Sequence, residues 1–289
     1  MTITVKLLKD SEGAVHFQAL QRIVWDSPED DLVPTHVSIT IATNGGGLLG
    51  AYADDGPIET GRMVGVAIWW LGIDDPAKLK PGQPNSLKVC SHMAGVLPEW
   101  QGKGIGRMLK FAQREHVLEQ GLTNRITWTY DPLFVANGIF NIHRLGAVCN
   151  TYYTNYYGEM RDGLNRGTPS DRCQVDWMLN SQRVVEAAQG KPREREWSFS
   201  DLQILPTESY GDDFRKPAGE QPALNGRPIA LPLPSDISRI RNSEPELSLT
   251  WRLYFRDVLV QSFDAGYSIV DCVPIQDRGH HYILTTNNQ

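Results

Sequence analysis

One short stretch of the chain combines residues that could bind an anionic ligand. The run GVLPEWQGKGIGRML, residues 95–109, places four glycines and two basic residues between an apolar segment and a predicted helix. Glycine loses more conformational freedom on folding than other residues, so some gain must offset that loss. The exposed N–H groups at a helix start attract anions, most often phosphate. The stretch therefore predicts a phosphate-binding turn at the start of a helix.

Two common glycine-rich phosphate loops do not fit this stretch. A Walker loop requires Ser or Thr after its lysine, but Gly104 follows Lys103. A dinucleotide fingerprint starting at Gly102 or Gly104 would need its third glycine where Arg107 or Leu109 stands. What does fit is a strand, then a spaced motif, then a helix. The motif residues are Val96, Pro98, Gln101, Gly104 and Gly106.

This motif resembles the acyl-CoA-binding motif of the GNAT superfamily of N-acyltransferases, over roughly the first 160 residues. The resemblance implies that backbone N–H groups of the turn hold the CoA pyrophosphate. A longer match resembles a branch linked to N-succinylamino-acid metabolism; it is carried by SHMAGVLPEWQGKGIG, WTYDPLFVANGIFNIHRLGAV and NYYGEMRDGLNRGTPSDR. The donor implied is acetyl-CoA or succinyl-CoA. The implied CoA-binding residues are Ala94, Val96, Gln101, Gly102, Lys103, Gly104, Gly106, Arg107 and Asn137.

Aminolysis of a thioester needs a neutral amine, a polarised carbonyl and a proton for the departing thiolate. The resemblance implies that the backbone N–H of Val96 polarises the carbonyl. His92 lies four residues earlier, and strand alternation predicts the same face as Ala94 and Val96. Imidazole titrates near neutrality, so His92 is the candidate general base. The alternative is a strand histidine hydrogen-bonded across the sheet.

The proton donor is a point where this chain departs from the superfamily. The position that usually carries a tyrosine is occupied by Ile142. We expect Tyr153 or Tyr156 to replace it, with packing or a substrate wall as the alternative for each tyrosine. Further candidates are Tyr152, Tyr157 and His143. The thiolate could also leave unprotonated or take a proton from water.

A few other side chains are candidates for contacts with substrate. Trp128 could line the acyl chain or belong to the core. Arg172 could bind a carboxylate of succinyl or of an amino acid through its planar fork, or form a surface ion pair with Asp171 or Asp176. Asn137 and Asn141 recur at helix spacing and match the pattern of the resembled branch, which implies that one could hydrogen-bond the pantetheine arm, with helix capping as the alternative for Asn137. His280-His281 has no third ligand nearby in sequence, so no metal site is predicted.

Composition limits the class of protein. The 289 residues are 40% hydrophobic and 21% charged, as in an ordinary globular protein. A net charge of −6 argues against a broad nucleic-acid-binding face. The four cysteines form no CxxC pair and predict reduced thiols, and the longest apolar run, residues 63–73, is too short to span a bilayer. We expect a cytoplasmic protein without nucleic-acid or membrane partners, and exposed sheet edges are compatible with a homodimer.

The elements that must position these residues follow from hydrophobic periodicity. The predicted order over residues 1–157 is strand, helix, helix, three strands, helix, strand, helix, strand. The second helix is expected at 35–43, and the last helix is expected to start at Asp131 and to end before Gly146. This order resembles that of the GNAT superfamily, and the resemblance implies a mixed α/β sheet that splays open between its fourth and fifth strands. Residues 1–160 would form the acyl-CoA-binding domain.

Residues 161–289 are predicted to form an α/β extension to that domain. A half-buried strand is expected after Arg172, an irregular proline-rich segment over 190–236, and a helix over 246–265. The chain is therefore predicted to transfer an acetyl or succinyl group from CoA to the primary amine of a small molecule, and the branch favours an amino acid. The alternative is a non-catalytic CoA-sensing or interaction module of the same fold.

Overall fold

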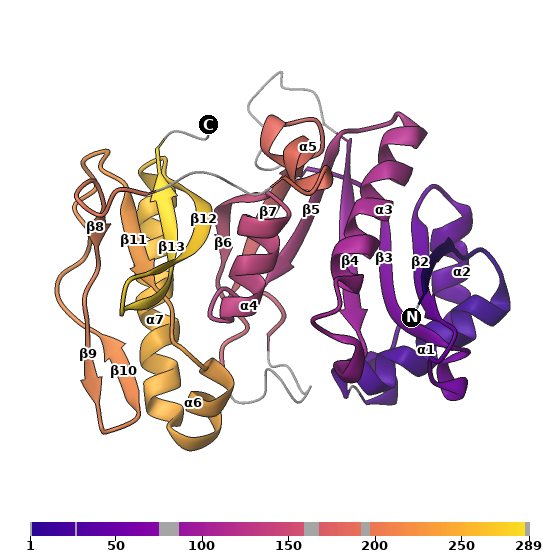
Figure 1. Ribbon diagram of the computed structural model, residues 1–289, viewed down its shortest axis with the longest axis horizontal. Coiled ribbons are helices and arrows are strands. Elements are labelled where there is room, and N and C mark those ends of the chain that lie inside the picture. The colour runs from indigo at the N-terminus through magenta and orange to yellow at the C-terminus, as the bar shows by residue number, and fades with distance from the viewer. Residues whose placement is uncertain (1, 27, 75–86, 159–167, 192–196, 287–289) are drawn as a thin grey trace. The chain divides into compact units, whose positions relative to one another are not determined.

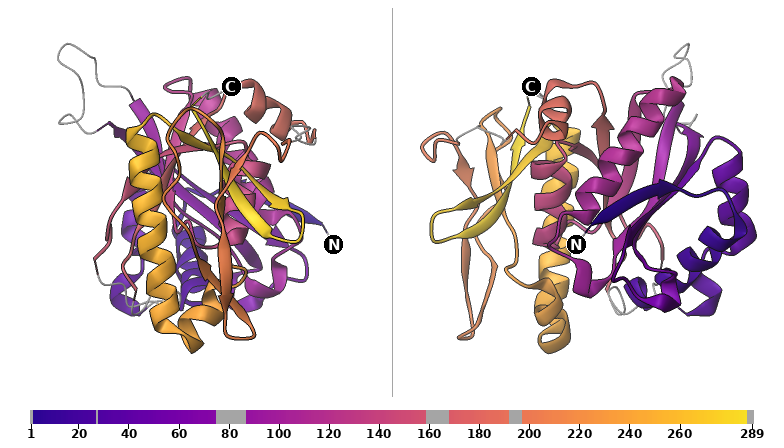
Figure 2. Two further views of the ribbon diagram at one scale, coloured as in Figure 1. Left: turned by 90° about the vertical axis from the view of Figure 1, so that its left-hand side faces the viewer. Right: turned by 45° about the vertical axis from the view of Figure 1, so that its right-hand side comes forward.

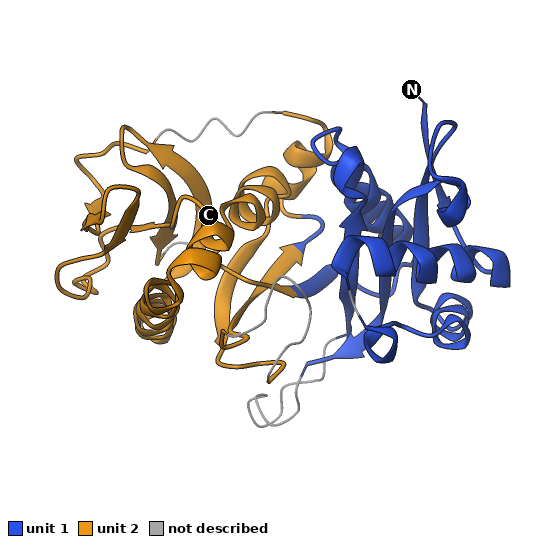
Figure 3. Cartoon of the chain, turned by 90° about the horizontal axis from the view of Figure 1, so that it is seen from below, with its two compact units in different colours: residues 1–128, 161–164, 178–180 blue, residues 129–160, 165–177, 181–289 orange. Residues whose placement is uncertain are grey.

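The computed structural model describes residues 2–26, 28–74, 87–158, 168–191 and 197–286. Two compact units are present, shown in separate colours in Figure 3. The first contains the described residues up to 128 together with 178–180, and the second contains 129–158, 168–177 and 181–286. The predicted domain boundary between residues 160 and 161 lies outside the described residues.

The first unit is a sheet with helices, in the strand order β1-β2-β3-β4-β5 (Figure 1). Strands β1 to β4 pair antiparallel, and β5 joins β4 in parallel. The elements are β1 (Ile3–Leu7), α1 (Ser11–Trp25), η1 (Glu29–Asp31), α2 (Thr35–Thr43), β2 (Gly47–Ala53), η2 (Ile58–Thr60), β3 (Met63–Ile73), β4 (Leu87–Val96), η4 (Pro98–Trp100), α3 (Ile105–Gln120) and β5 (Arg125–Tyr130), whose last two residues enter the second unit.

The core of the first unit forms around β3. Its first seven residues are all buried, which explains why this segment is an unbroken apolar run. A Cβ on Gly65 would lie 3.1 Å from both Ile105 and Leu109, so glycine lets α3 pack closely onto this strand. The carboxylate of Asp10 accepts the Gly13 N–H at 2.8 Å and starts α1. The close packing at Gly65 holds the start of α3 against the sheet.

In the second unit the sheet strands follow the order β7-β6-β12-β13-β11-β8 and pair mostly antiparallel. The long helix α7 packs against β6 and β10 (Figure 2). The elements are α4 (Val135–Gly138), η5, a π-helical segment (Ile139–Arg144), β6 (Val148–Tyr153), β7 (Arg172–Met178), α5 (Gln182–Ala188), β8 (Gln203–Ile204), β9 (Thr207–Tyr210), β10 (Phe214–Pro217), β11 (Ile229–Pro232), α6 (Ile237–Ser243), α7 (Pro245–Asp264), β12 (Ser268–Ile275) and β13 (Gly279–Thr285).

The mixed α/β fold and the predicted element order through residue 153 are confirmed, including the helix at 35–43. Two local predictions are wrong. The segment 190–236 is not irregular throughout, because β8 to β11 lie within it, and β11 is fully buried. The helix expected from Asp131 begins only at Val135, since the Asp131 carboxylate accepts the Leu133 N–H at 3.0 Å and forms a turn there.

Candidate active site

The glycine-rich turn between β4 and α3 is held at both sides by the residues that flank it. Trp100 is buried beneath the turn, and the Gln101 amide donates to the Val96 carbonyl at 3.1 Å. Gln101, Gly102, Lys103 and Gly104 themselves are exposed. The turn is therefore anchored to the end of β4 while its backbone faces outward.

The two central glycines of the turn have a conformation that other residues rarely adopt. Gly102 has φ 74° and Gly104 has φ 80°, both in the left-handed region. Among the described residues, no atom lies within 4 Å of a Cβ placed at either position, so open space lies beside the backbone. Gly104 is the residue before α3, and no side chain caps the helix there. Within the described part of the chain, the N–H groups of Ile105 and Gly106 at the start of α3 thus have no side-chain cap.

Two cations lie beside this helix start. The Lys103 ammonium lies 4.5 Å from the Trp100 ring centroid, and the Arg107 guanidinium lies 4.6 Å from that of Phe111. The first turn of α3 carries no acidic residue. The helix dipole and both cations therefore favour a negatively charged ligand at this end of α3.

The far half of β4 extends beyond its pairing with β5. The two strands pair only at Val89–Ile126 and Cys90–Thr127, so residues 91–96 lie past the end of this ladder. On the other edge, Leu97 donates its N–H to the Val64 carbonyl, which makes Val96–Gly65 a non-hydrogen-bonded pair. By the same alternation, the N–H groups of Ala94 and Val96 both point away from β3. These are two backbone donors on the splayed edge.

A β-bulge places His92 differently from the prediction. The pairs on either side are Trp69–Ser91 and Ile68–Met93, so His92 is the extra residue. Ala94 and Val96 oppose Ala67 and Gly65 on the face toward α3, whereas the His92 ring lies 5.1 Å from that of Trp70. The expected shared face is therefore wrong, because one inserted residue reverses the alternation.

The chemistry of His92 nevertheless suits a proton acceptor. Desolvation by its surroundings lowers the pKa of the His92 imidazole below its ordinary value. A lowered pKa keeps the ring unprotonated at neutral pH, which a general base requires. The contact with Trp70 orients the ring without consuming a nitrogen.

A buried lysine on α3 was missed by the sequence analysis. Lys110 is only 2% exposed, and its ammonium donates to Ser91 and Gln113 and lies over the Trp128 ring. The helical spacing could have indicated it, because positions 110, 113 and 117 lie on one buried face of α3. Trp128 thus contacts a cation, and its predicted role beside an acyl chain stays a prediction.

The tyrosines of the second unit form a stacked group around β6. The rings of Tyr153 and Tyr156 stack at 4.6 Å, and Tyr157 meets Tyr156 edge-on at 4.7 Å. The Tyr153 hydroxyl donates to the Gln174 amide oxygen at 3.4 Å. Tyr152 is engaged differently, since it donates to Asp171 at 2.8 Å, and burial and that carboxylate raise its pKa. The role of Tyr153 or Tyr156 as the acid remains a prediction.

Arg172 is buried in an ion-pair network, not on the surface. Its guanidinium lies 4.0 Å from the Asp131 carboxylate, which also accepts from Arg241 and Arg252 at 2.7 Å each. Burial alone would raise the pKa of Asp131, but Arg252 and Arg241 hold it at about 2. One alternative for Arg172 was a surface ion pair with Asp171. The Asp171 carboxylate instead pairs with Arg256. Binding of a ligand carboxylate by Arg172 stays a prediction.

Asn137 and His143, two further candidates in the second unit, contact other residues of that unit. The Asn137 amide reaches the Asp131 carbonyl at 3.4 Å, and Ile142 is fully buried. The His143 ring lies 2.9 Å from the Asp271 carboxylate. His281 is buried in β13, and no group of three potential metal ligands occurs among the described residues.

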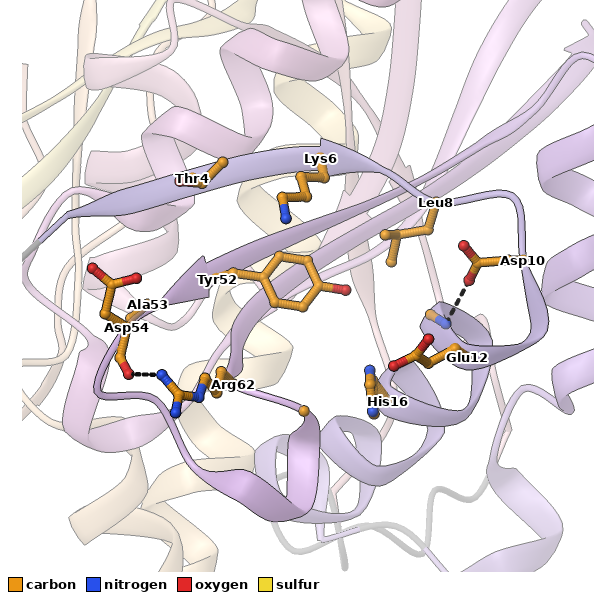
Figure 4. Close-up of a pocket in the computed structure, with 12 residues that line it drawn as sticks. Thr4, Lys6, Leu8, Asp10, Glu12, His16, Tyr52, Ala53, Asp54 and Arg62 are labelled. Carbon is orange, nitrogen blue, oxygen red and sulfur yellow. Dashed lines mark hydrogen bonds between the residues drawn. The ribbon is translucent and has the colours of Figure 1, made fainter.

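Figure 4 shows a polar cavity of about 410 Å³ in the first unit. It is lined by β1, the start of α1 and the β2–β3 connection, with Lys6, Glu12, His16 and Tyr52 around it. Burial, with Asp10 and Glu12, raises the pKa of Tyr52 to about 12. None of the lining residues belongs to the glycine turn or to β4, so this cavity is a separate feature of the unit.

All four cysteines are free thiols. Within the described part of the chain, helices are either too short or too polar to cross a bilayer.

No protein-family profile and no curated protein matches the sequence. Among solved structures, the chain is similar to Arabidopsis thaliana NAA60 in complex with a bisubstrate analogue, at 13% identity and TM-score 0.48, over 62% of this chain and 100% of that chain. It is also similar to the ribosomal-protein-S18-alanine N-acetyltransferase from Escherichia coli, at 15% identity and TM-score 0.43, over 63% and 97%. IAA acetyltransferase from Bacillus cereus is similar at 14% identity and TM-score 0.42, over 62% and 100%. At these identities and TM-scores, no activity or substrate is carried over to this chain.

Proposed function

We propose that this protein is a CoA-dependent N-acyltransferase of the GNAT type. The observation that carries the proposal is the open glycine turn at the start of α3, directly beside the splayed edge of β4. A CoA ester with its diphosphate at the turn would extend its pantetheine arm and acyl group along that edge. The sequence motif and the geometry of the turn support the same ligand.

The residues present fit a CoA diphosphate. Space beside Gly102 and Gly104 lets phosphate oxygens approach the backbone, which a Cβ would obstruct. The N–H groups of the first turn of α3 would donate to those oxygens, while Lys103 and Arg107 add positive charge. The interaction of a ligand's negative charge with the helix N-terminus contributes about 0.3–1 kcal/mol at such an exposed position.

The bound thioester supplies an activated acyl carbon. The N–H groups of Ala94 and Val96 point from β4 toward the open edge and would stabilise negative charge on the carbonyl oxygen. His92, unprotonated at neutral pH, would take a proton from the substrate ammonium directly or through water, and the neutral amine would then attack the carbonyl carbon. The strand thus carries both the oxyanion donors and the base.

The acceptor we propose is the primary amine of a small molecule, with an amino acid favoured, and the donor is acetyl-CoA or succinyl-CoA. The support for a carboxylate-bearing substrate is the resemblance of the sequence to the branch linked to N-succinylamino-acid metabolism, with Arg172 as the candidate carboxylate-binding residue. A guanidinium fork binds carboxylates in a bidentate way. Succinyl-CoA and amino acids both carry such a group.

Thiol release tests this function. The full-length protein is incubated with acetyl-CoA or succinyl-CoA and a panel of amines, in which each amino acid is paired with its decarboxylated amine. Amine-dependent release of CoA, with amide product detected by mass, is the expected result. Tight CoA binding without turnover of any donor would instead favour a CoA-sensing module. The absence of both binding and turnover would overturn the proposal.

A further inference from the structure

The polar cavity of the first unit, drawn in Figure 4, is separate from the glycine turn and from β4. Its volume of about 410 Å³ lies within the range of small-molecule pockets, about 300–1,000 Å³. Three parts of the chain enclose it: β1, the start of α1, and the connection from β2 to β3. The cavity is therefore large enough for a small metabolite.

The Tyr52 side chain lies across the cavity. A Cβ on Gly50 would lie 2.8 Å from its ring and 3.1 Å from the Leu8 side chain, so the ring packs over the backbone of β2. In Figure 4 its hydroxyl points toward Glu12, while Arg62 lies on the other side of the ring. Burial, with Asp10 and Glu12, raises the pKa of Tyr52 to about 12. The hydroxyl is therefore neutral at pH 7 and can accept a hydrogen bond.

Charged side chains of both signs line the cavity without pairing with one another. The carboxylates of Asp10 and Glu12 lie at the hydroxyl end of the Tyr52 ring. The Lys6 ammonium lies 5.4 Å from the centroid of that ring. Among the described residues, neither Lys6 nor Arg62 forms an ion pair. Opposite charges are thus kept apart on two sides of one aromatic ring.

The backbone at Arg62 indicates that the position of its side chain matters. Arg62 has φ 66°, in the left-handed region that residues other than glycine rarely adopt. Its N–H donates to the Pro57 carbonyl at 2.7 Å, and its carbonyl accepts the Ala53 N–H at 3.1 Å. The guanidinium also donates to the Asp54 carbonyl. Strained residues that are held in this way are typical of ligand-binding positions.

The neighbouring Gly61 joins the two sides of the cavity. It has φ 58°, and a Cβ there would lie 2.1–2.4 Å from three atoms of the His16 ring. Glycine is therefore required for the ring, which comes from α1, to lie against the connection that carries Arg62. This packing keeps the acidic start of α1 and the Arg62 guanidinium in a fixed arrangement.

We propose that this cavity binds a small zwitterion, a molecule with an ammonium group and a carboxylate joined by a short apolar chain. Asp10 and Glu12 would hold the ammonium, and Lys6 and Arg62 would hold the carboxylate through charge-assisted hydrogen bonds. The apolar chain would lie along the Tyr52 ring. A ligand with a single charge would be attracted at one end and repelled at the other. This binding is independent of the proposed acyl transfer.

An NMR titration of the isotope-labelled full-length protein tests the inference. The probe is 6-aminohexanoate, and the comparison compounds are hexylamine and hexanoate, which each carry one of its two charges. The probe should shift the amide signals of Gly13 and Gly61, which line the cavity, and should bind about tenfold more tightly than either comparison compound. Gly121, at the end of α3, is the internal control and should not shift. Failure of the probe to saturate these shifts, or equal binding of all three compounds, overturns the inference.

Two charge variants assign the two ends of the cavity. Arg62→Gly removes a cation and relieves the left-handed strain, so it should bind the probe about tenfold more weakly without a lower melting temperature. Its affinity for hexylamine should not decrease. Glu12→Gln should weaken binding of the probe and of hexylamine, but not of hexanoate.

Asp277→Gly is the matched control for Arg62→Gly, because it also replaces a residue of positive φ, at 53°, but lies in the second unit. It should bind the probe as the wild type does. Unchanged probe affinity in both Arg62→Gly and Glu12→Gln would place the probe elsewhere and refute the inference. Failure of the wild type to bind CoA would instead refute the proposed function and leave this inference intact.

Discussion

At the scale of single residues, the proposed general base His92 depends on its surroundings. Desolvation lowers the pKa of the imidazole below its ordinary value. A lowered pKa leaves the imidazole free to accept a proton at neutral pH, as the proposed reaction requires. The rate is expected to fall as pH decreases through that pKa, because the imidazole is then protonated.

His92→Gln should lower kcat by about 10²-fold, since the amide can hydrogen-bond but cannot take up a proton. The wild-type rate should rise with pH through the His92 pKa, which lies below 6.5, and this acidic limb should be flat in the variant. Thiol release measured between about pH 5 and pH 9 checks both effects. An unchanged acidic limb would remove His92 from the mechanism.

The lowered pKa of Asp131 leads to a prediction about the stability of the second unit. Its pKa is about 2 when folded and 3.8 ordinarily, so it contributes about 2 kcal/mol of stability above pH 4. That contribution is lost as pH falls from 3.8 toward 2. Asp131→Asn leaves buried arginines uncompensated and should reduce the free energy of unfolding by about 3–5 kcal/mol.

The control for this variant is Asp213→Asn, which breaks the exposed pair between Asp213 and Arg239 in the same unit. An exposed pair contributes at most about 1 kcal/mol. Urea denaturation of both variants makes the comparison. Equal losses of stability would show that the Asp131 network is no stronger than a surface ion pair.

At the scale of elements, the start and end of α3 offer a matched pair of glycines. Gly104 and Gly121 both have positive φ and open space where a Cβ would lie, but only Gly104 adjoins the proposed diphosphate site. Gly104→Ala should raise KM for acyl-CoA by about tenfold, which corresponds to 1.4 kcal/mol. Gly121→Ala should carry the same backbone strain without that effect.

Steady-state kinetics with varied acyl-CoA measures the difference between these two variants. Similar KM values for Gly104→Ala and Gly121→Ala would mean that the turn does not approach the ligand. A loss of thermal stability common to both is expected, because each forces alanine into the left-handed region.

The elements also show where sequence reasoning succeeded and where it could not. Short-range signals were sufficient for the order of strands and helices and for the glycine turn, because periodicity and glycine spacing are local. The β-bulge at His92 was not predictable, since it depends on how β3 and β4 pair over a long connection. Lys110 was overlooked because a lysine suggests a solvated face, while its burial depends on packing of α3 against the sheet.

At the scale of the whole molecule, a predicted boundary at residue 160 would cut through contacts within each unit. Asp131 depends on Arg241 and Arg252, and β6 pairs with β12. In the first unit, Arg114 donates to the Leu179 carbonyl, and the Leu179 N–H donates to Asn124 at 2.8 Å. These long-range pairs have no signature in the local sequence.

Truncation after residue 160 should therefore give a chain that does not unfold cooperatively. The removed segment carries the arginines that neutralise Asp131 and the Leu179 contacts of α3. Circular dichroism during heating, with the full-length protein as the control, measures this. A sharp thermal transition of the shortened chain would instead support an independent domain over 1–160.

The central claim is that the backbone from Gln101 to Arg107 binds the diphosphate of a CoA ester. Isothermal titration calorimetry of the full-length protein with acetyl-CoA, succinyl-CoA and CoA tests it most directly. We predict saturable binding of about one ligand per chain that weakens as salt rises, because charged groups contribute at an exposed site. The absence of saturable binding with all three ligands would contradict the account.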